Sequence, residues 1–190
     1  PELSTYVPKT VEVSKKTYQC HVMIGNRAYN HTDTNRVALA LLANLLAGQS
    51  PSSILNQVLR EKNGLTYNVE SGYTSFEKSG VFTLYMSCDS DKRERCEELT
   101  AREITKLCTV PLSSYNMARY KKQLLGQIAV AGDNNESLML AAARSLLIYN
   151  EIDTLAQIEK RIESVSASDI MSVANDVFDE NLISKLIYKR

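Results

Sequence analysis

The sequence lacks an excess of charge of either sign, and it lacks a long apolar run. Lysine plus arginine and aspartate plus glutamate both number 22 among 190 residues, so the formal net charge at pH 7 is zero. A nucleic-acid-binding surface needs clustered positive charge, which argues against a nucleic-acid partner. The longest apolar run, residues 37–43, is far shorter than the roughly 20 residues that a membrane-spanning helix needs. We therefore expect no nucleic-acid binding and no membrane span.

Histidine is scarce, and the common catalytic and cofactor motifs are absent. The two histidines, His21 and His31, stand in neither H-E-x-x-H nor H-x-x-E-H, the helical spacings that place two imidazoles on one zinc ion. Neither glycine-rich nucleotide-binding motif occurs, and the nucleophile elbow G-x-S-x-G is also missing. We expect no metal and no cofactor in this chain. Motifs alone would make it a non-catalytic domain.

The four cysteines do not form a C-x-x-C pair. Cys20, Cys88, Cys96 and Cys108 are scattered in a way that is typical of buried free thiols rather than of a disulfide framework or a zinc knuckle. Free thiols favour a reducing compartment, and the cytoplasm is the one we expect. The periplasm and the mitochondrial matrix are the alternatives. The opening Pro-Glu-Leu is not a typical natural start, so we expect a fragment of a longer chain.

Apolar spacing predicts two helices in the first third of the chain. Residues 35–47 follow an i, i+3, i+4 pattern and are apolar nearly all round, which predicts a buried helix ended by Gly48. A second helix is expected to begin with Ser50 as its N-cap and Pro51 at its first position. The pair Asn63-Gly64 is expected to end it.

Alternating patterns predict the strands. Residues 18–24 read as a strand that Gly25 and Asn26 break, and a second strand begins near residue 66, with Tyr67 expected on the same face as Val69. A hairpin turn at residues 77–80 leads to an interior return strand, and residues 182–188 form the last strand. Further helices are expected at 89–107, after Ser113 with an interruption near Gly132, at 138–149, around 155–162 and after the capping box of residues 166–169. Residues 1–10 are expected to be extended.

The order of these elements indicates the fold class. Strands, two helices, a hairpin, several helices and a final strand favour an antiparallel or mixed sheet with helices mainly on one face, which is an α+β fold. Neither a repeat nor a linker divides the sequence. We therefore expect residues 1–190 to form a single domain.

Several motifs follow one another in order between residues 41 and 92, and weaker matches continue to the end of the chain. The motifs are Ser52-Ser53-Ile54-Leu55, Leu59-Arg60-Glu61-Lys62, Gly64-Leu65-Thr66-Tyr67 and Ser79-Gly80-Val81-Phe82. Their order closely resembles the C-terminal half-domain of pitrilysin/insulinase-type zinc peptidases, a family that includes mitochondrial processing peptidase and the core proteins of the respiratory cytochrome complex. The resemblance covers roughly residues 15–190.

The resemblance implies a role for one arginine and one tyrosine. In that family one half holds zinc through H-x-x-E-H, and the metal-free half faces it across a chamber as in a clamshell. The metal-free half contributes an arginine and a tyrosine, which here are Arg60 and Tyr67. By analogy, Tyr67 donates a hydrogen bond to the substrate carbonyl oxygen, and Arg60 binds substrate backbone carbonyls. We therefore predict Arg60 and Tyr67 as the catalytic residues of this chain.

The same resemblance implies partners that this chain does not contain. Because the zinc motif is missing, zinc is expected in an N-terminal half of the parent or in a partner subunit, and the parent is expected to be a dimeric zinc endopeptidase. Its substrate would be a peptide or an unfolded protein, and this fragment alone would cleave nothing. Two alternatives remain open: a non-catalytic scaffold subunit of the same family, and a peptide-binding module that uses a free sheet edge.

Overall fold

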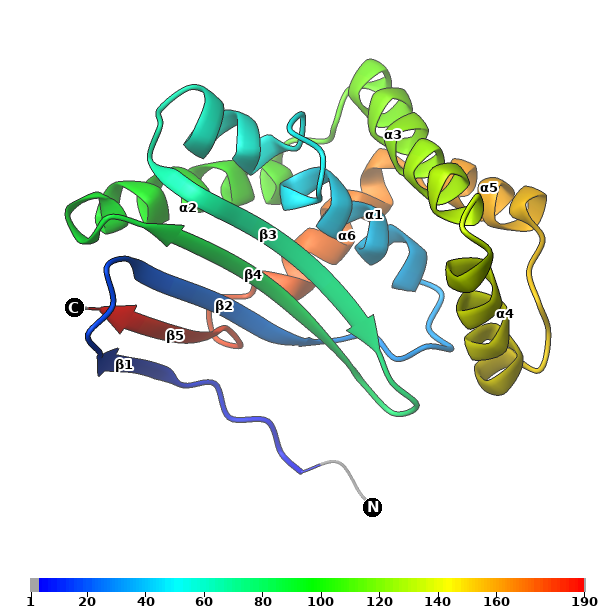
Figure 1. Cartoon of the computed structure of the whole chain (residues 1–190), viewed down its shortest axis with the longest axis horizontal. Coiled ribbons are helices and arrows are strands. Elements are labelled where there is room, and N and C mark those ends of the chain that lie inside the picture. Colours follow the sequence, from blue (N-terminus) through cyan, green and yellow to red (C-terminus); the bar gives the residue numbers. More distant parts are fainter. Residues whose placement is uncertain (1–3, 190) are drawn as a thin grey trace.

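The strands form one mixed five-stranded sheet in the computed structural model of the chain, which describes residues 4–189. The strand order is β1-β5-β2-β4-β3, so β1 and β3 form the two edges (Figure 1). Strand β1 runs parallel to β5, and every other neighbouring pair is antiparallel. The strands are β1 (Thr10–Ser14), β2 (Cys20–Ala28), β3 (Thr66–Ser75), β4 (Gly80–Cys88) and β5 (Ser184–Lys189).

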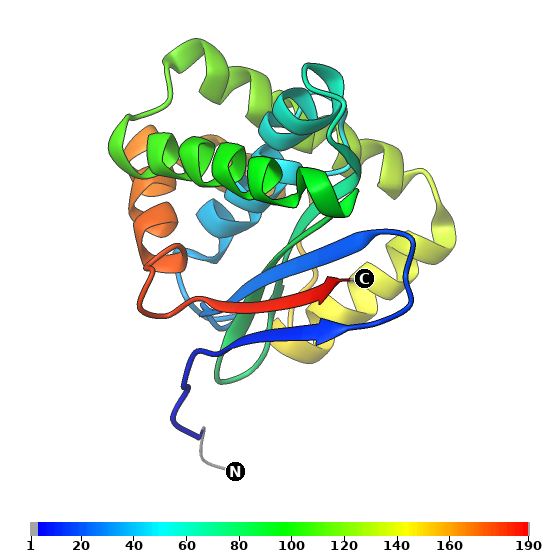
Figure 2. The same ribbon diagram turned by 90° about the vertical axis from the view of Figure 1, so that its left-hand side faces the viewer.

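Most of the helices form a layer on one side of this sheet, so the expected α+β fold is confirmed (Figures 1 and 2). Two short helical segments, η1 (Asn56–Glu61) and η2 (Ser90–Lys92), flank the β3–β4 hairpin in sequence. The longer helices are α1 (Arg36–Ala47), α2 (Arg93–Thr109), α3 (Ser114–Gly132), α4 (Asn135–Tyr149), α5 (Leu155–Ser164) and α6 (Ala167–Val177).

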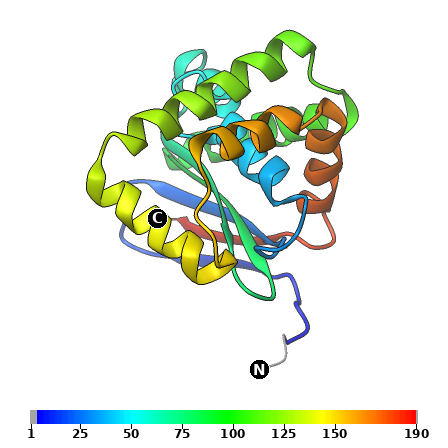
Figure 3. The ribbon, with the colours of Figure 1, turned by 90° about the vertical axis from the view of Figure 1, so that its right-hand side faces the viewer.

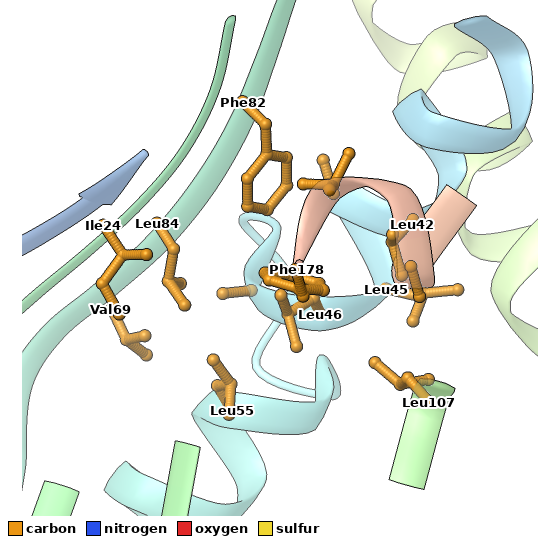
Figure 4. Close-up of a cluster of buried hydrophobic side chains, with 14 of the residues drawn as sticks. Ile24, Leu42, Leu45, Leu46, Leu55, Val69, Phe82, Leu84, Leu107 and Phe178 are labelled. Atoms are coloured by element: carbon orange, nitrogen blue, oxygen red, sulfur yellow. The ribbon is translucent and has the colours of Figure 1, made fainter. Parts of the chain in front are cut away.

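Helix α1 lies at the centre of the hydrophobic core, as its sequence predicts. Each leucine that is buried fully contributes about 1.5–3 kcal/mol relative to an exposed one, so α1 supplies a large share of the core stabilisation. The rings of Phe82 on the sheet and Phe178 after α6 pack edge to face, with their centroids 5.3 Å apart (Figure 4). The α1 leucines with no exposed surface are Leu39, Leu41, Leu42, Leu45 and Leu46.

The predicted end of the first strand is wrong. Strand β2 does not break at Gly25 and Asn26 but continues to Ala28, paired with β4 throughout. A Cβ at Gly25 would lie 3.3 Å from the backbone oxygen of Phe82, so this glycine permits a close approach instead of a turn. The buried side chain of Asn26 donates to the backbone oxygen of Val177 at 2.8 Å, which explains a polar residue inside a strand.

The second helix also differs from the prediction at its start. Residues 51–53 form a turn, and helical structure begins at residue 54. In η1 the N–H of Lys62 donates to the oxygen of Gln57, five residues earlier, which is the wide π-helical pattern. The end is as predicted: Gly64 has a φ of 57°, and its N–H donates to the oxygen of Arg60 at 3.0 Å.

The left-handed backbone of Gly64 gives a stability prediction. The substitution Gly64→Ala should lower the free energy of unfolding by about 1–2 kcal/mol, because a side chain disfavours that conformation. No atom lies within 4 Å of the added Cβ, so steric crowding does not contribute. Urea denaturation of both proteins measures the difference.

A matched control lies in α3. A Cβ at Gly126 also meets no atom within 4 Å, but this glycine has ordinary helical backbone. Gly126→Ala should therefore raise the free energy of unfolding by roughly 0.5–1 kcal/mol. Equal effects of the two substitutions would contradict the role given to Gly64.

Candidate substrate-facing site

Arg60 lies in the last turn of η1, and its side chain points away from the core. The preceding residue, Leu59, is fully buried, whereas Arg60 is exposed. Among residues 4–189, no hydrogen bond or ion pair joins the Arg60 guanidinium to another side chain or to the backbone. Its charge complements the negative end of the helix dipole. The backbone of Arg60 is therefore fixed next to a buried residue, while the N–H donors of its guanidinium are available to a ligand.

Tyr67 occupies a β-bulge at the start of β3. Thr66 pairs with Cys88 and Asn68 pairs with Ser87, which leaves Tyr67 as the extra residue. The bulge makes the sequence prediction wrong, because it turns Tyr67 away from the face of Val69. Tyr67 is 57% exposed, whereas Val69 is 2% exposed. The aromatic ring is thus presented to solvent instead of packing on α1.

The Tyr67 hydroxyl is held by an acidic residue that the sequence reasoning missed. It donates to Oδ1 of Asp89 at 3.0 Å, and Nζ of Lys92 donates to Oδ2 of the same carboxylate at 2.8 Å. The hydrogen bond to Asp89 raises the pKa of Tyr67, so the phenol keeps its proton at neutral pH. The hydrogen bonds from Lys92 and Tyr67 lower the pKa of Asp89. The β3–β4 register brings residues 67 and 89 together, and alternation in the sequence alone does not determine that register.

A groove of about 740 Å³ begins beside these residues. It runs between β3, α1 and α3, and Arg60 is one of its lining residues. Tyr67 is not among them, although the next residue of β3, Asn68, is. The structure therefore places Arg60 on the wall of the groove, whereas Tyr67 follows the sequence of β3 next to the lining residue Asn68 and is not itself part of the wall.

The donor side chains of residues 4–189 do not form a zinc site. His21 shares a hydrogen bond of 2.8 Å with the hydroxyl of Tyr85, and the His31 ring packs edge to face on Tyr149. Within residues 4–189, no three histidine, cysteine, aspartate or glutamate side chains come together in a way that could hold a metal. Three of the cysteines are buried, and all four are free thiols, as predicted. None of the described helices is long and apolar enough to cross a membrane.

Comparisons with known proteins show the family to which this fold belongs. Residues 1–124 match the family model described as "Peptidase M16 inactive domain". A protein of Streptomyces coelicolor that is named an uncharacterized zinc protease is 30% identical over 165 residues, which cover 87% of this chain and 36% of that protein. The chain therefore belongs to the family of the peptidase M16 inactive domain. The resemblance stated from the sequence is confirmed.

Solved structures show the same fold. A protease from Helicobacter pylori superposes with a TM-score of 0.86 at 19% identity, covering 97% of this chain and 44% of that one. A peptidase M16 inactive domain from Pseudomonas fluorescens gives 0.82 at 16% identity, covering 96% of this chain and 43% of that one. The chain thus spans less than half the length of these relatives.

The contact between Tyr67 and Asp89 gives a titration prediction. Asp89→Asn should lower the pKa of Tyr67 toward its ordinary value of 10.0, because the carboxylate that favours the neutral phenol is gone. The ¹³Cζ chemical shift of Tyr67, followed by NMR through alkaline pH, measures this pKa. In the unsubstituted chain the same signal should also respond in acid, below pH 3.8, as Asp89 is protonated and its hydrogen bond with Tyr67 weakens.

Asp91→Asn is the matched control. It removes the same charge two residues further along the chain, without touching the hydrogen bond to Tyr67. It should shift the pKa of Tyr67 less than Asp89→Asn does. Equal shifts would mean that long-range charge, not the hydrogen bond, sets the ionisation of this phenol.

Proposed function

We propose that this chain is the substrate-binding, transition-state-supporting half of a zinc endopeptidase that cleaves peptides or unfolded segments. The observation that carries the proposal is the pairing of an unpartnered, exposed guanidinium at Arg60 with an exposed, protonated phenol at Tyr67. A buried helix end and a paired strand hold the two residues, so their backbones are fixed. Family membership supports the same interpretation.

The two side chains have different tasks in this proposal. Arg60 presents five N–H donors in a fixed fork and binds backbone carbonyls of the substrate. Tyr67 donates a hydrogen bond to the carbonyl oxygen on which negative charge develops. Its hydroxyl has a single O–H donor, which in this structure bonds to Asp89, so substrate binding must exchange that hydrogen bond for one to the carbonyl.

Zinc and the group that activates water must come from outside this chain. We propose that they lie in a further half of the parent or in a partner subunit, and that the parent is a dimer. Large exposed apolar side chains on α4 support an association of this kind, since exposed apolar surface can mark interaction sites. Helix α4 has no buried residue and lies along the outer side of the molecule (Figure 3). The large apolar residues of α4 that are exposed are Leu138, Met139, Leu140, Leu146 and Leu147. The cytoplasm remains the compartment that we propose.

Tyr67→Phe in the full-length parent tests the proposal. Removing one donor to a developing oxyanion should lower kcat by about 10²–10³, while KM changes little. The unfolding midpoint should change little, because the ring is exposed and the lost hydrogen bond to Asp89 lies at the surface. Cleavage of an unstructured fluorogenic peptide measures the rate.

Two controls accompany this substitution. Tyr115→Phe removes a hydroxyl from another exposed tyrosine, which is 76% exposed on α3, and should leave kcat unchanged. Zinc analysis of the dialysed parent decides where the metal lies: about one zinc per chain places it in the same polypeptide, and none places it in a separate subunit. If Tyr67→Phe changes turnover less than twofold in the zinc-containing assembly, the proposed role of the phenol is wrong.

A further inference from the structure

Strand β3 leaves one of its two sides without a neighbouring strand. It is ten residues long and pairs with β4 alone, so it forms an edge of the sheet. An edge strand carries a row of backbone N–H and C=O groups that can pair with another extended chain. The groove lies along residues 68–73 of this strand. These residues span about 20 Å at the rise of an extended strand.

The shape of the groove leaves room for a backbone beside β3. The α1 side chains that line it include three short ones, Ala40, Ala43 and Ala47. The opposite wall is formed by α3, whose nearest apolar residues are Leu124 and Ile128. The volume of about 740 Å³ is within the usual range of ligand sites, which is roughly 300–1,000 Å³.

The polar groups of the groove match the groups of a peptide backbone. The Asn44 side chain donates to Oε1 of Gln127 at 2.6 Å, which links α1 to α3. The Nε2 group of Gln127 has no partner among residues 4–189, so its donors remain available. A carboxamide both donates and accepts, as a peptide unit does.

The charge of the groove argues against a phosphate or nucleotide as its ligand. Only Arg60 and Glu70 are charged among the residues that line it, and Glu70 already accepts a hydrogen bond from Asn68 at 2.6 Å. A phosphate or nucleotide site would need several convergent cations or a glycine-rich anion loop. One cation at one end suits a neutral backbone that ends near Arg60.

We propose that this groove binds an extended polypeptide segment as an added strand on β3, running along residues 68–73 toward Arg60 and Tyr67. Main-chain hydrogen bonds to β3 supply most of the affinity, so sequence selectivity is low. The site extends the proposed function by locating a substrate segment on this half, but binding itself needs no zinc and no second half. A second copy of this chain could use the same edge, and the experiment distinguishes that outcome.

The first test measures binding by this chain alone. The probe is a fluorescein-labelled peptide of about 12 alternating threonine and valine residues with a lysine at each end, long enough to cover the strand. Anisotropy should show saturable binding. The same peptide with N-methyl groups on its central residues cannot form the ladder and should bind at least about tenfold more weakly. Equal binding of the two peptides would overturn the proposal.

Two adjacent positions on α3 provide matched variants. Ala131 is exposed and lines the groove, whereas Val130 is 72% exposed and is not among the lining residues. Ala131→Trp should fill the groove and weaken peptide binding at least about tenfold, and Val130→Trp should change it less than twofold. Circular dichroism checks that both variants fold. Equal effects would mean that the peptide binds elsewhere.

Hydrogen exchange locates the bound segment. Peptide should slow exchange at every second amide along residues 69–75, because alternate N–H groups of a strand point to the same side. Strand β1, the other edge of the sheet, is the internal control and should not change. Protection of β3 that grows with chain concentration in the absence of peptide would mean that a second copy occupies the edge, and the proposal would be wrong.

The outcomes separate this inference from the proposed function. Peptide binding on β3 together with normal turnover of the Tyr67→Phe parent would keep the groove and reject the catalytic role. A large loss of turnover in that parent without any binding on β3 would keep the catalytic role and reject the groove.

Discussion

The burial of α1 against the sheet is the constraint on which the rest of the domain depends. Its leucines fill the core, while its alanines allow β3 to approach closely, and Ser71 of β3 donates to the backbone oxygen of Ala43 at 2.6 Å. Because the segment after α1 must return to the same sheet, η1 and its glycine-terminated end are fixed in position. The Arg60–Tyr67 corner and the α1 side of the groove are therefore consequences of how one apolar helix packs. A change in α1 would move all of them together.

Local signals predicted most of the helices and the central hairpin. The apolar pattern of α1, the capping box at Ser166 and Asp169 and the turn before Gly80 are each contained within a few residues, and the structure confirms them. Strand β1 was missed because its stability comes from pairing with β5 at the other end of the chain. Gly25 was misread because a glycine that permits close packing cannot be distinguished from one that makes a turn until its neighbour is known.

In the candidate site, too, some features could be predicted from local sequence and others could not. Arg60 and Tyr67 stand seven residues apart within a motif, so a family resemblance was sufficient to select them. The bulge that exposes Tyr67 and the carboxylate of Asp89 that holds its hydroxyl depend on strand register, which alternation alone does not determine. The groove could not be predicted, because its walls come from α1, β3 and α3, which are far apart in the sequence.

The position of β5 has a consequence for how the domain is made. This strand is the last element of the sheet in sequence, yet it lies between β1 and β2 (Figure 1). During synthesis on the ribosome, β2 and β4 can pair early, but the side of β2 that will receive β5 stays open until residues 184–189 have emerged. Strand β1 has no partner until the same moment. A nascent chain of this domain thus carries an open strand edge until its last strand has emerged, and such an edge can pair with other chains.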